Sequence, residues 1–224
     1  MTEIQFNEIK ERLSKWRQER HLTYENQRKD FLGNVFEELS EYFRAKDDLE
    51  RIDALCDIAV FCFNVNDVKF SNYKCYMKSD KVDFEIFDIA SQINSIAIYK
   101  ANFEIDSVKV ILDTLIALLH KKCEILKFDF YKCMLETIKE IESRTGHYDE
   151  GLKKFVKDIG AYTEKEAYEI AKREKVFFNF VNFKLCQDRR TMEYYWVDDA
   201  NDSANCKRIK IKKWYKADYK SCRL

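Results

Sequence analysis

The sequence predicts a mostly helical protein. Its 224 residues contain no proline and only four glycines, so the two strongest helix breakers are nearly absent. Hydrophobic residues make up 46% of the chain, which is enough for a core and argues against extended disorder. Apolar side chains recur at helical spacing over most of the first 144 residues. We therefore expect an all-α fold, followed by an appendage in which aromatic and β-branched residues become frequent.

Composition excludes several classes of protein. The 40 basic and 40 acidic residues give zero net charge, so no bulk charge attracts nucleic acid or an anionic membrane. The eight cysteines form no C-x-x-C pair, which removes support for a zinc or thioredoxin-type site. No Walker A pattern and no Glu-x-x-His pair occurs, which excludes P-loop NTPases and di-iron bundles. Charged residues from Glu3 onward and short apolar runs favour a cytoplasmic protein without a membrane partner.

The first helix is expected over residues 4–20, where apolar side chains recur every three or four positions. Thr23 is a suitable N-cap for a second helix over 24–45. A short polar turn then precedes a third, strongly apolar helix, which Asp47 or Asp48 can cap.

Helical periodicity is interrupted once in the middle of the chain. Residues 65–82 lose it and predict a long loop with at most some extended structure. After residue 158 a capping-box start at Thr163 predicts a short helix to Lys172, and residues 176–224 predict either two or three strands or an irregular arm. Between these regions, three apolar stretches predict long helices over 83–101, 106–122 and 128–144.

Acidic side chains cluster on the second and third expected helices at helical spacing. They are Glu37, Glu38 and Glu41 on the second helix, and Glu50, Asp53 and Asp57 on the third. Carboxylates that face one another at the edge of an apolar core repel and lose hydration, at a cost of several kcal/mol per buried ion. A divalent cation removes this conflict, and oxygen ligands without imidazole favour Mg²⁺, with Mn²⁺ as the alternative, over Zn²⁺. The competing interpretation is an ordinary solvated face, because 36% of the chain is charged.

The order of these acids resembles a known motif. E-E-x-x-E on one helix, a short turn and E-x-x-D on the next helix are the hallmark of the all-α nucleoside triphosphate pyrophosphohydrolases, the superfamily of MazG-like and dimeric dUTPase-like enzymes. The first half matches directly. The second half aligns in two ways. Glu50 and Asp53 form a literal E-x-x-D, whereas Asp57 better matches the family Asp that precedes an apolar run, with Asp53 in place of the expected Glu. Both alignments stay open, and with them the fourth ligand and the number of metal ions.

The resemblance implies a helical bundle of this type over residues 1–160, with 161–224 as an appendage of unassigned role. It implies Mg²⁺-dependent hydrolysis of a nucleoside or deoxynucleoside triphosphate to the monophosphate and pyrophosphate, as in the control of nucleotide pools. Glu38, Glu41 and Asp57 would be catalytic as well as metal-binding. The resemblance also implies a homodimer or higher homo-oligomer, or an internal duplication that completes the four-helix unit.

Six further residues are candidates for substrate binding. The resembling enzymes place polar nucleotide contacts early on the second helix and a basic segment after the later helices. The corresponding residues of this chain are Asn26, Gln27, Arg144, Lys153, Lys154 and Lys157. Basic side chains are what a triphosphate requires opposite a metal site. A solvated basic loop explains the last four residues equally well.

A different class of function rests on the end of the sequence. Eight basic residues between Lys207 and Arg223 are interleaved with Trp214, Tyr215 and Tyr219, a composition compatible with single-stranded nucleic acid. The alternative hypothesis is therefore a non-enzymatic helical protein that binds nucleotide or single-stranded nucleic acid through this tail. Zero net charge argues against nucleic acid as a partner.

Overall fold

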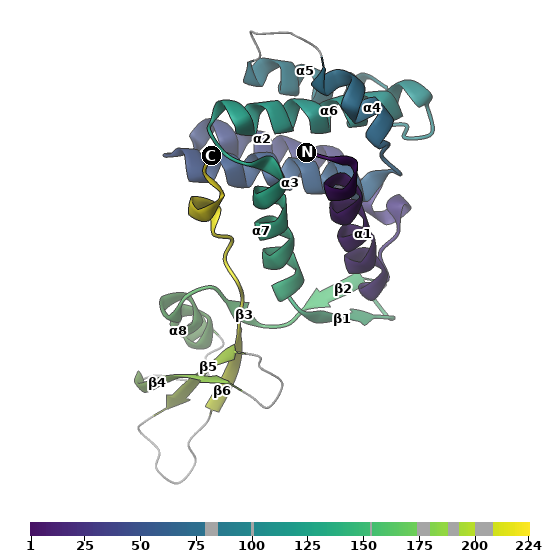
Figure 1. The fold of residues 1–224 in the computed structure, drawn as a ribbon. Coiled ribbons are helices and arrows are strands. Elements are labelled where there is room, and N and C mark those ends of the chain that lie inside the picture. The colour runs from purple at the N-terminus through teal and green to yellow at the C-terminus, as the bar shows by residue number, and fades with distance from the viewer. Residues whose placement is uncertain (79–84, 100, 153, 174–179, 188–192, 200–207) are drawn as a thin grey trace. The chain divides into compact units, whose positions relative to one another are not determined.

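The structure is a computed structural model of residues 1–224, and it describes all of them except 79–84, 100, 153, 174–179, 188–192 and 200–207. The described part contains eight α-helices and a few short strands, which confirms the expectation of a mostly helical chain (Figure 1). The chain forms two compact units, Met1–Ile138 with Ala217–Leu224, and Lys139–Lys216. The boundary expected at residue 160 lies within the second of these units.

Side-chain caps determine where the first three helices begin. Thr2, Thr23 and Asp47 each accept a hydrogen bond from a backbone N–H two or three residues later. The sequence predicts the cap at Thr23, and of its two candidates for the third helix, Asp47 and Asp48, the cap is Asp47. The helices that follow are α1 (Glu3–Glu19), α2 (Tyr24–Arg44) and α3 (Asp48–Val65).

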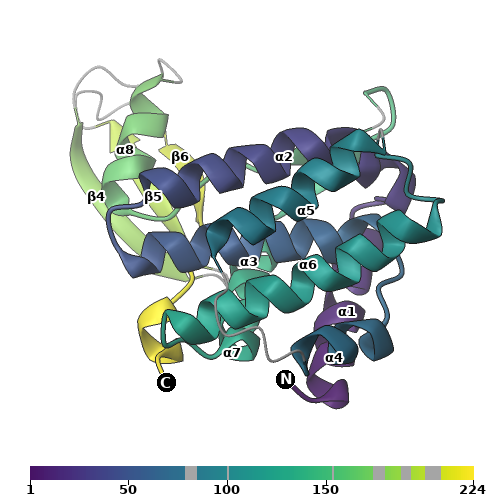
Figure 2. The same cartoon turned by 90° about the horizontal axis from the view of Figure 1, so that it is seen from above.

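Helix α3 lies at the centre of the first unit. Eleven of its 18 residues are buried, because it packs against α1, α2 and α6 on different sides. Viewed from above, α5 and α6 lie across the near side of α2 and α3 (Figure 2). The remaining long helices of this unit are α5 (Ile86–Ile98), α6 (Asp106–Ile125) and α7 (Phe130–Ser143), the last of which continues into the second unit. They confirm the three predicted helices, although residues 83, 84 and 100 of the predicted ranges lie outside the described part.

A helix forms where the sequence predicts a loop. Helix α4 (Phe70–Met77) lies within residues 65–82, so that prediction is wrong for this stretch. The carboxylate of Asp113 on α6 accepts hydrogen bonds from the backbone N–H of Lys69 at 3.0 Å and from the side chain of Asn72 at 2.7 Å. A residue from another helix therefore supplies the N-terminal cap that the local sequence lacks.

The second unit contains the β structure. A basic loop was expected after α7, but Gly146–Asp149 (β1) and Lys154–Lys157 (β2) pair as an antiparallel hairpin. Gly146 allows this strand pairing, since a Cβ there would lie 2.1 Å from the carbonyl oxygen of Val156. A second sheet has the strand order β3-β6-β5-β4, and α8 (Glu164–Arg173) contacts β3 and β5. Its strands are β3 (Gly160–Ala161), β4 (Phe180–Gln187), β5 (Glu193–Asp199) and β6 (Arg208–Lys213). The predicted short helix and the strand alternative for residues 176–224 are thereby confirmed.

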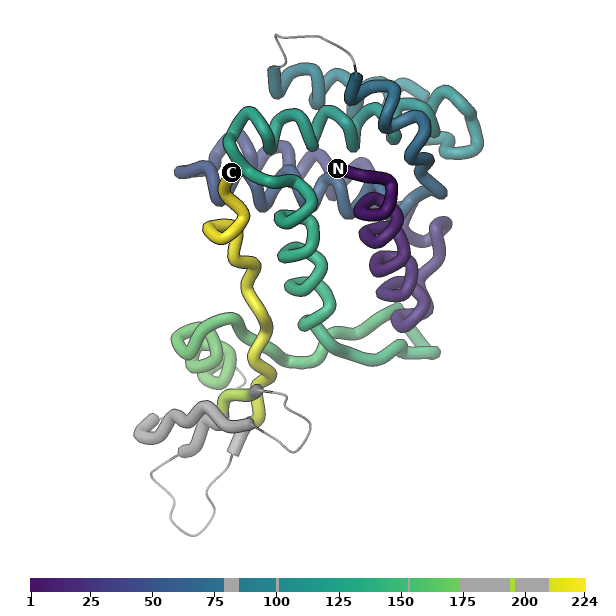
Figure 3. The backbone as a smooth tube through the Cα atoms, viewed as in Figure 1, coloured from purple at the N-terminus to yellow at the C-terminus, as the bar shows by residue number. Residues whose placement is uncertain are grey.

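The chain then returns to the first unit. Its last element is a short 3-10 helix, η1 (Tyr219–Cys222), which contacts α3. Phe128 and Arg223 form an antiparallel bridge, so the end of the tube in Figure 3 reaches the turn between α6 and α7. None of the helices in the described residues is long and apolar enough to cross a membrane.

Candidate carboxylate site

Packing of α2 on α3 brings the two acidic groups of the motif together. Glu38 is half-buried at this helix pair. Burial, followed by the negative charges of Asp57, Glu41, Asp53 and Glu37, raises the pKa of the Glu38 carboxyl to about 8. Five of the six acids predicted from the spacing therefore share one electrostatic environment.

The five carboxylates differ in how far they are exposed to solvent. Glu37 and Glu41 are exposed on α2, whereas Glu38, Asp53 and Asp57 are half-buried between the helices. The apolar residues next to them, including Leu39 and Ile58, belong to the core of the first unit. The acids thus lie at the edge of the core, where a small ligand has access from solvent.

Glu50 has a different role from the other five acids. Its Oε2 accepts a hydrogen bond of 2.7 Å from the backbone N–H of Lys46, and its side chain is exposed in the first turn of α3. This bond holds the connection between α2 and α3. Of the two alignments left open by the sequence, the structure groups Asp53 and Asp57 with Glu38 and places Glu50 at the connection.

The donor chemistry of the cluster suits a hard divalent cation. All its ligand atoms are carboxylate oxygens, the type that Mg²⁺ and Mn²⁺ prefer. As the side chains lie, however, no group of three or more His, Cys, Asp or Glu side chains in the described residues converges closely enough to hold an ion. Binding of a cation would require these side chains to rotate inwards.

A tyrosine distant in sequence also belongs to this cluster. The hydroxyl of Tyr219 donates a hydrogen bond of 2.7 Å to Oδ1 of Asp53 and lies 2.9 Å from Oγ1 of Thr137. Burial raises the pKa of this phenol well above its ordinary value, and the negative charges of Asp53 and Asp57 add to that effect, so the phenol remains a donor. In the sequence analysis Tyr219 enters only the alternative hypothesis of a nucleic-acid-binding tail, and no local pattern connects it to Asp53.

Asn26 and Gln27 lie far along α2 from the acids. About 11 residues separate them from Glu37, which corresponds to about 16 Å of helix. Oδ1 of Asn26 accepts from the backbone N–H of Thr23 at 2.7 Å, so this side chain closes the capping box at the start of α2. Gln27 is half-buried on the same turn. The structure assigns Asn26 a capping role and does not bring either side chain to the acids.

The four basic candidates belong to the second unit. Arg144 donates to Glu140 at 2.7 Å and to the hydroxyl of Tyr162 at 2.6 Å. Burial and the positive charge of Arg144 lower the pKa of Lys157, so these two cations lie near one another. Lys154 is exposed at the start of β2, and Lys153 lies outside the described residues. Their expected role in holding phosphates stays a prediction.

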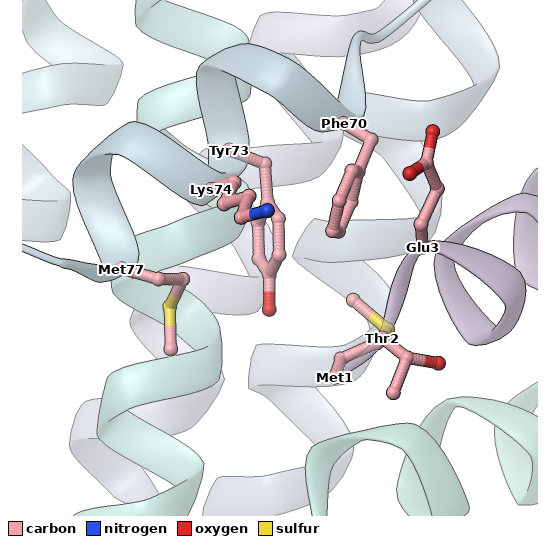
Figure 4. A pocket seen from close by; sticks show the side chains of 7 residues that line it. All are labelled: Met1, Thr2, Glu3, Phe70, Tyr73, Lys74 and Met77. Carbon is pink, nitrogen blue, oxygen red and sulfur yellow. The ribbon is translucent and has the colours of Figure 1, made fainter.

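A pocket of about 350 Å³ lies elsewhere in the first unit, between the start of α1 and α4 (Figure 4). The ring of Tyr73 lines it, and the hydroxyl of this residue is 2.5 Å from Nδ1 of buried His120. The lining side chains are Met1, Thr2, Glu3, Phe70, Tyr73, Lys74 and Met77. None of the motif acids is among them, so this pocket is separate from the carboxylate cluster.

Comparison of the chain with protein-family models, with curated proteins and with solved structures finds no match. The functional argument therefore rests on the residues of the cluster and on the motif that they form.

Proposed function

We propose that the protein hydrolyses a nucleoside or deoxynucleoside triphosphate to the monophosphate and pyrophosphate, with Mg²⁺ or Mn²⁺ as cofactor. The observation that carries this proposal is the environment of Glu38, a half-buried carboxyl among four other acids from two packed helices. A protein gains no stability from this arrangement by itself, because like charges repel at the edge of an apolar core. The order of the acids also resembles that of the all-α nucleoside triphosphate pyrophosphohydrolases, with the departure on the third helix described above.

Glu37, Glu38, Glu41, Asp53 and Asp57 would hold the cation in this proposal. Without a cation, Glu38 keeps its proton up to about pH 8, and binding of the ion displaces that proton. When bound, the metal polarises a phosphoryl oxygen, lowers the pKa of bound water and offsets charge on the leaving pyrophosphate. A ligand set built on two packed helices positions the phosphates with little freedom.

The chain itself supplies the base and the orientation. Glu38 or Glu41 accepts the proton of the attacking water, since each is a carboxylate on the α2 face of the cluster. Asp57 and Asp53 lie on α3 and would fix the position of the ion relative to that base.

The proposal is tested by a product assay on the full chain. Each common ribo- and deoxyribonucleoside triphosphate, with dUTP, is supplied in turn with Mg²⁺ or Mn²⁺, and pyrophosphate and orthophosphate are measured separately. We expect pyrophosphate and monophosphate in equal amounts from one or a few substrates. Orthophosphate alone would indicate a different hydrolase, and no product from any substrate would contradict the proposal.

Variants of the motif acids test the site within the same assay. Glu38→Gln, Glu41→Gln and Asp57→Asn should each abolish turnover while circular dichroism shows a retained fold. Glu11→Gln is the matched control, because Glu11 is exposed on α1 and is not among the motif acids. Normal turnover in all three motif variants would show that the reaction occurs elsewhere.

We also propose that the enzyme assembles as a homodimer or higher homo-oligomer. Phe43 on α2 and Phe87 on α5 are 54% and 69% exposed, and their ring centroids lie 6.1 Å apart. Phe36, which lies about two helical turns before Phe43 on α2, is also exposed. Neighbouring exposed aromatic rings of this kind favour association with another protein surface.

The alternative function, nucleic-acid binding by the last residues, is not favoured by the contacts of its aromatic rings. Trp214 packs edge-on against Tyr162 and lies against Gly160, where an added Cβ would be 2.1 Å from the indole. Tyr219 is buried against α3. Stacking of bases requires exposed rings, and of these three aromatic residues only Tyr215 is well exposed to solvent.

A further inference from the structure

The segment of residues 217–224 reaches the carboxylate cluster from the far end of the chain. Tyr219 is 5% exposed, and its hydroxyl donates to Asp53, a residue 166 positions earlier. A hydrogen bond from a phenol to an ionised carboxylate is charge-assisted and fixes the orientation of the carboxylate.

Backbone contacts hold this segment in place on both sides of Tyr219. The backbone N–H of Asp218 donates to Oε2 of Glu136 at 3.1 Å. The carbonyl oxygen of Cys222 accepts from the N–H of Asp129 at 2.9 Å, and the N–H of Leu224 donates to the carbonyl of Lys127 at 2.9 Å. Together with the contact between Tyr219 and Thr137, these bonds determine where the phenol lies.

We propose that Tyr219 is a positioning residue of the carboxylate site, and that binding of a divalent cation and seating of segment 217–224 strengthen each other. This inference rests on the proposed function. Because a carboxylate has two oxygens, a phenol bond to one and a metal bond to the other are compatible. Hydrogen bonds of this type orient ligands and raise metal affinity, and coupling between two binding events is reciprocal.

The inference also concerns how firmly segment 217–224 is held when no metal ion is bound. The five acids repel one another when no cation is bound, and the bond from Tyr219 holds Asp53 in place against that repulsion. If the bond from Tyr219 favours binding of a cation, the bound cation stabilises the seated segment by the same free energy. The segment should therefore open less often when the site is loaded.

The first arm of the test measures metal affinity. Isothermal titration of the full chain with Mn²⁺ and Mg²⁺ compares wild type with Tyr219→Phe, which removes the hydroxyl and keeps the ring. We expect affinity to fall roughly 10–100-fold, the usual effect of losing such a supporting hydrogen bond. Tyr131→Phe is the matched control, because the Tyr131 hydroxyl also donates to a carboxylate, that of Glu8, at 2.5 Å. It should bind the metal as wild type does.

The second arm measures the seating of the segment in the unmodified chain, and so remains valid if Tyr219→Phe does not fold. The Cys222 thiol is 2% exposed while the segment is seated, whereas Cys75 is exposed on α4 and serves as the internal reference. Labelling with N-ethylmaleimide, followed by peptide mass spectrometry, gives the ratio of the two rates. Saturating Mg²⁺ should slow Cys222 several-fold relative to Cys75, and Asp53→Asn should abolish this effect.

The outcomes separate the inference from the proposed function. If wild type binds neither Mg²⁺ nor Mn²⁺ and hydrolyses no nucleotide, the proposed function fails and the inference fails with it. If wild type binds the metal, two results overturn the inference alone. One is an affinity of Tyr219→Phe within two-fold of wild type, and the other is a Cys222 labelling rate that the cation does not change.

Discussion

Replacement of Glu38 by glutamine should stabilise the metal-free protein, by an amount that depends on pH. In the folded chain the pKa of Glu38 is about 8, against 4.5 for an ordinary glutamate. Between these two values the unfolded chain is ionised while the folded chain keeps the proton. Folding therefore becomes less favourable as pH rises through this window, and above pH 8 the penalty is constant. Glutamine has nearly the same shape and carries no charge, so it removes the penalty.

The magnitude follows from the same two pKa values. At about 1.36 kcal/mol per pH unit, the difference between the two pKa values sets an upper bound of about 5 kcal/mol on the loss of stability that ionised Glu38 causes. Glu38 is only half-buried, and solvent screening reduces the expected stabilisation by Glu38→Gln to about 1–2 kcal/mol at pH 8.5. Well below pH 4.5 the variant and wild type should be equally stable, because Glu38 is then mostly protonated in both the folded and the unfolded state.

Urea denaturation with EDTA, followed by circular dichroism at pH 5 and pH 8.5, measures this effect. Glu11→Gln is again the control and should change stability little at either pH, since surface substitutions of this kind have small effects. Addition of Mg²⁺ should reverse the order of stabilities, because wild type binds the ion and the variant does not. A Glu38→Gln variant no more stable than wild type at pH 8.5 in EDTA would refute the reasoning about the cluster.

Three other predictions concern the fold and its assembly. Burial lowers the pKa of His120 to about 3. The unfolded chain therefore gains a proton below about pH 6.5 that the folded chain does not, and stability should fall by about 2 kcal/mol by pH 5. His120→Gln should remove that part of the pH dependence in urea titrations, and an unchanged slope would contradict it. Gly160→Ala places a Cβ 2.1 Å from Trp214 and should lower the melting temperature, with a cost of about 1–3 kcal/mol. Gly33→Ala on α2, where nothing lies within 4 Å, should instead stabilise by about 1 kcal/mol, and equal effects of the two would count against the packing argument. Phe43→Glu should convert an oligomer to monomers in light scattering, and a monomeric wild type would argue against this interface.

The sequence predicts the helix starts that depend on nearby residues. Thr23 and Asp47 cap α2 and α3 through side chains that bond to N–H groups two or three residues later. The start of α4 was not readable, because its cap is Asp113, which is 44 positions from Lys69. The β1–β2 hairpin was also missed. Its strands are only four residues each, too short to establish an alternating pattern against the basic residues around them.

The sequence by itself determined that acids of α2 and α3 would meet beside a core. Spacing of three and four residues places side chains on one helix face, and a short connection makes the two helices neighbours. Only the tertiary structure decided which acids share that site. Glu50 bonds to the backbone of Lys46, whereas Asp53 is held by Tyr219 from the end of the chain. The physical reason is that helical periodicity is local, whereas a hydrogen bond between residues 166 positions apart depends on how the whole first unit packs.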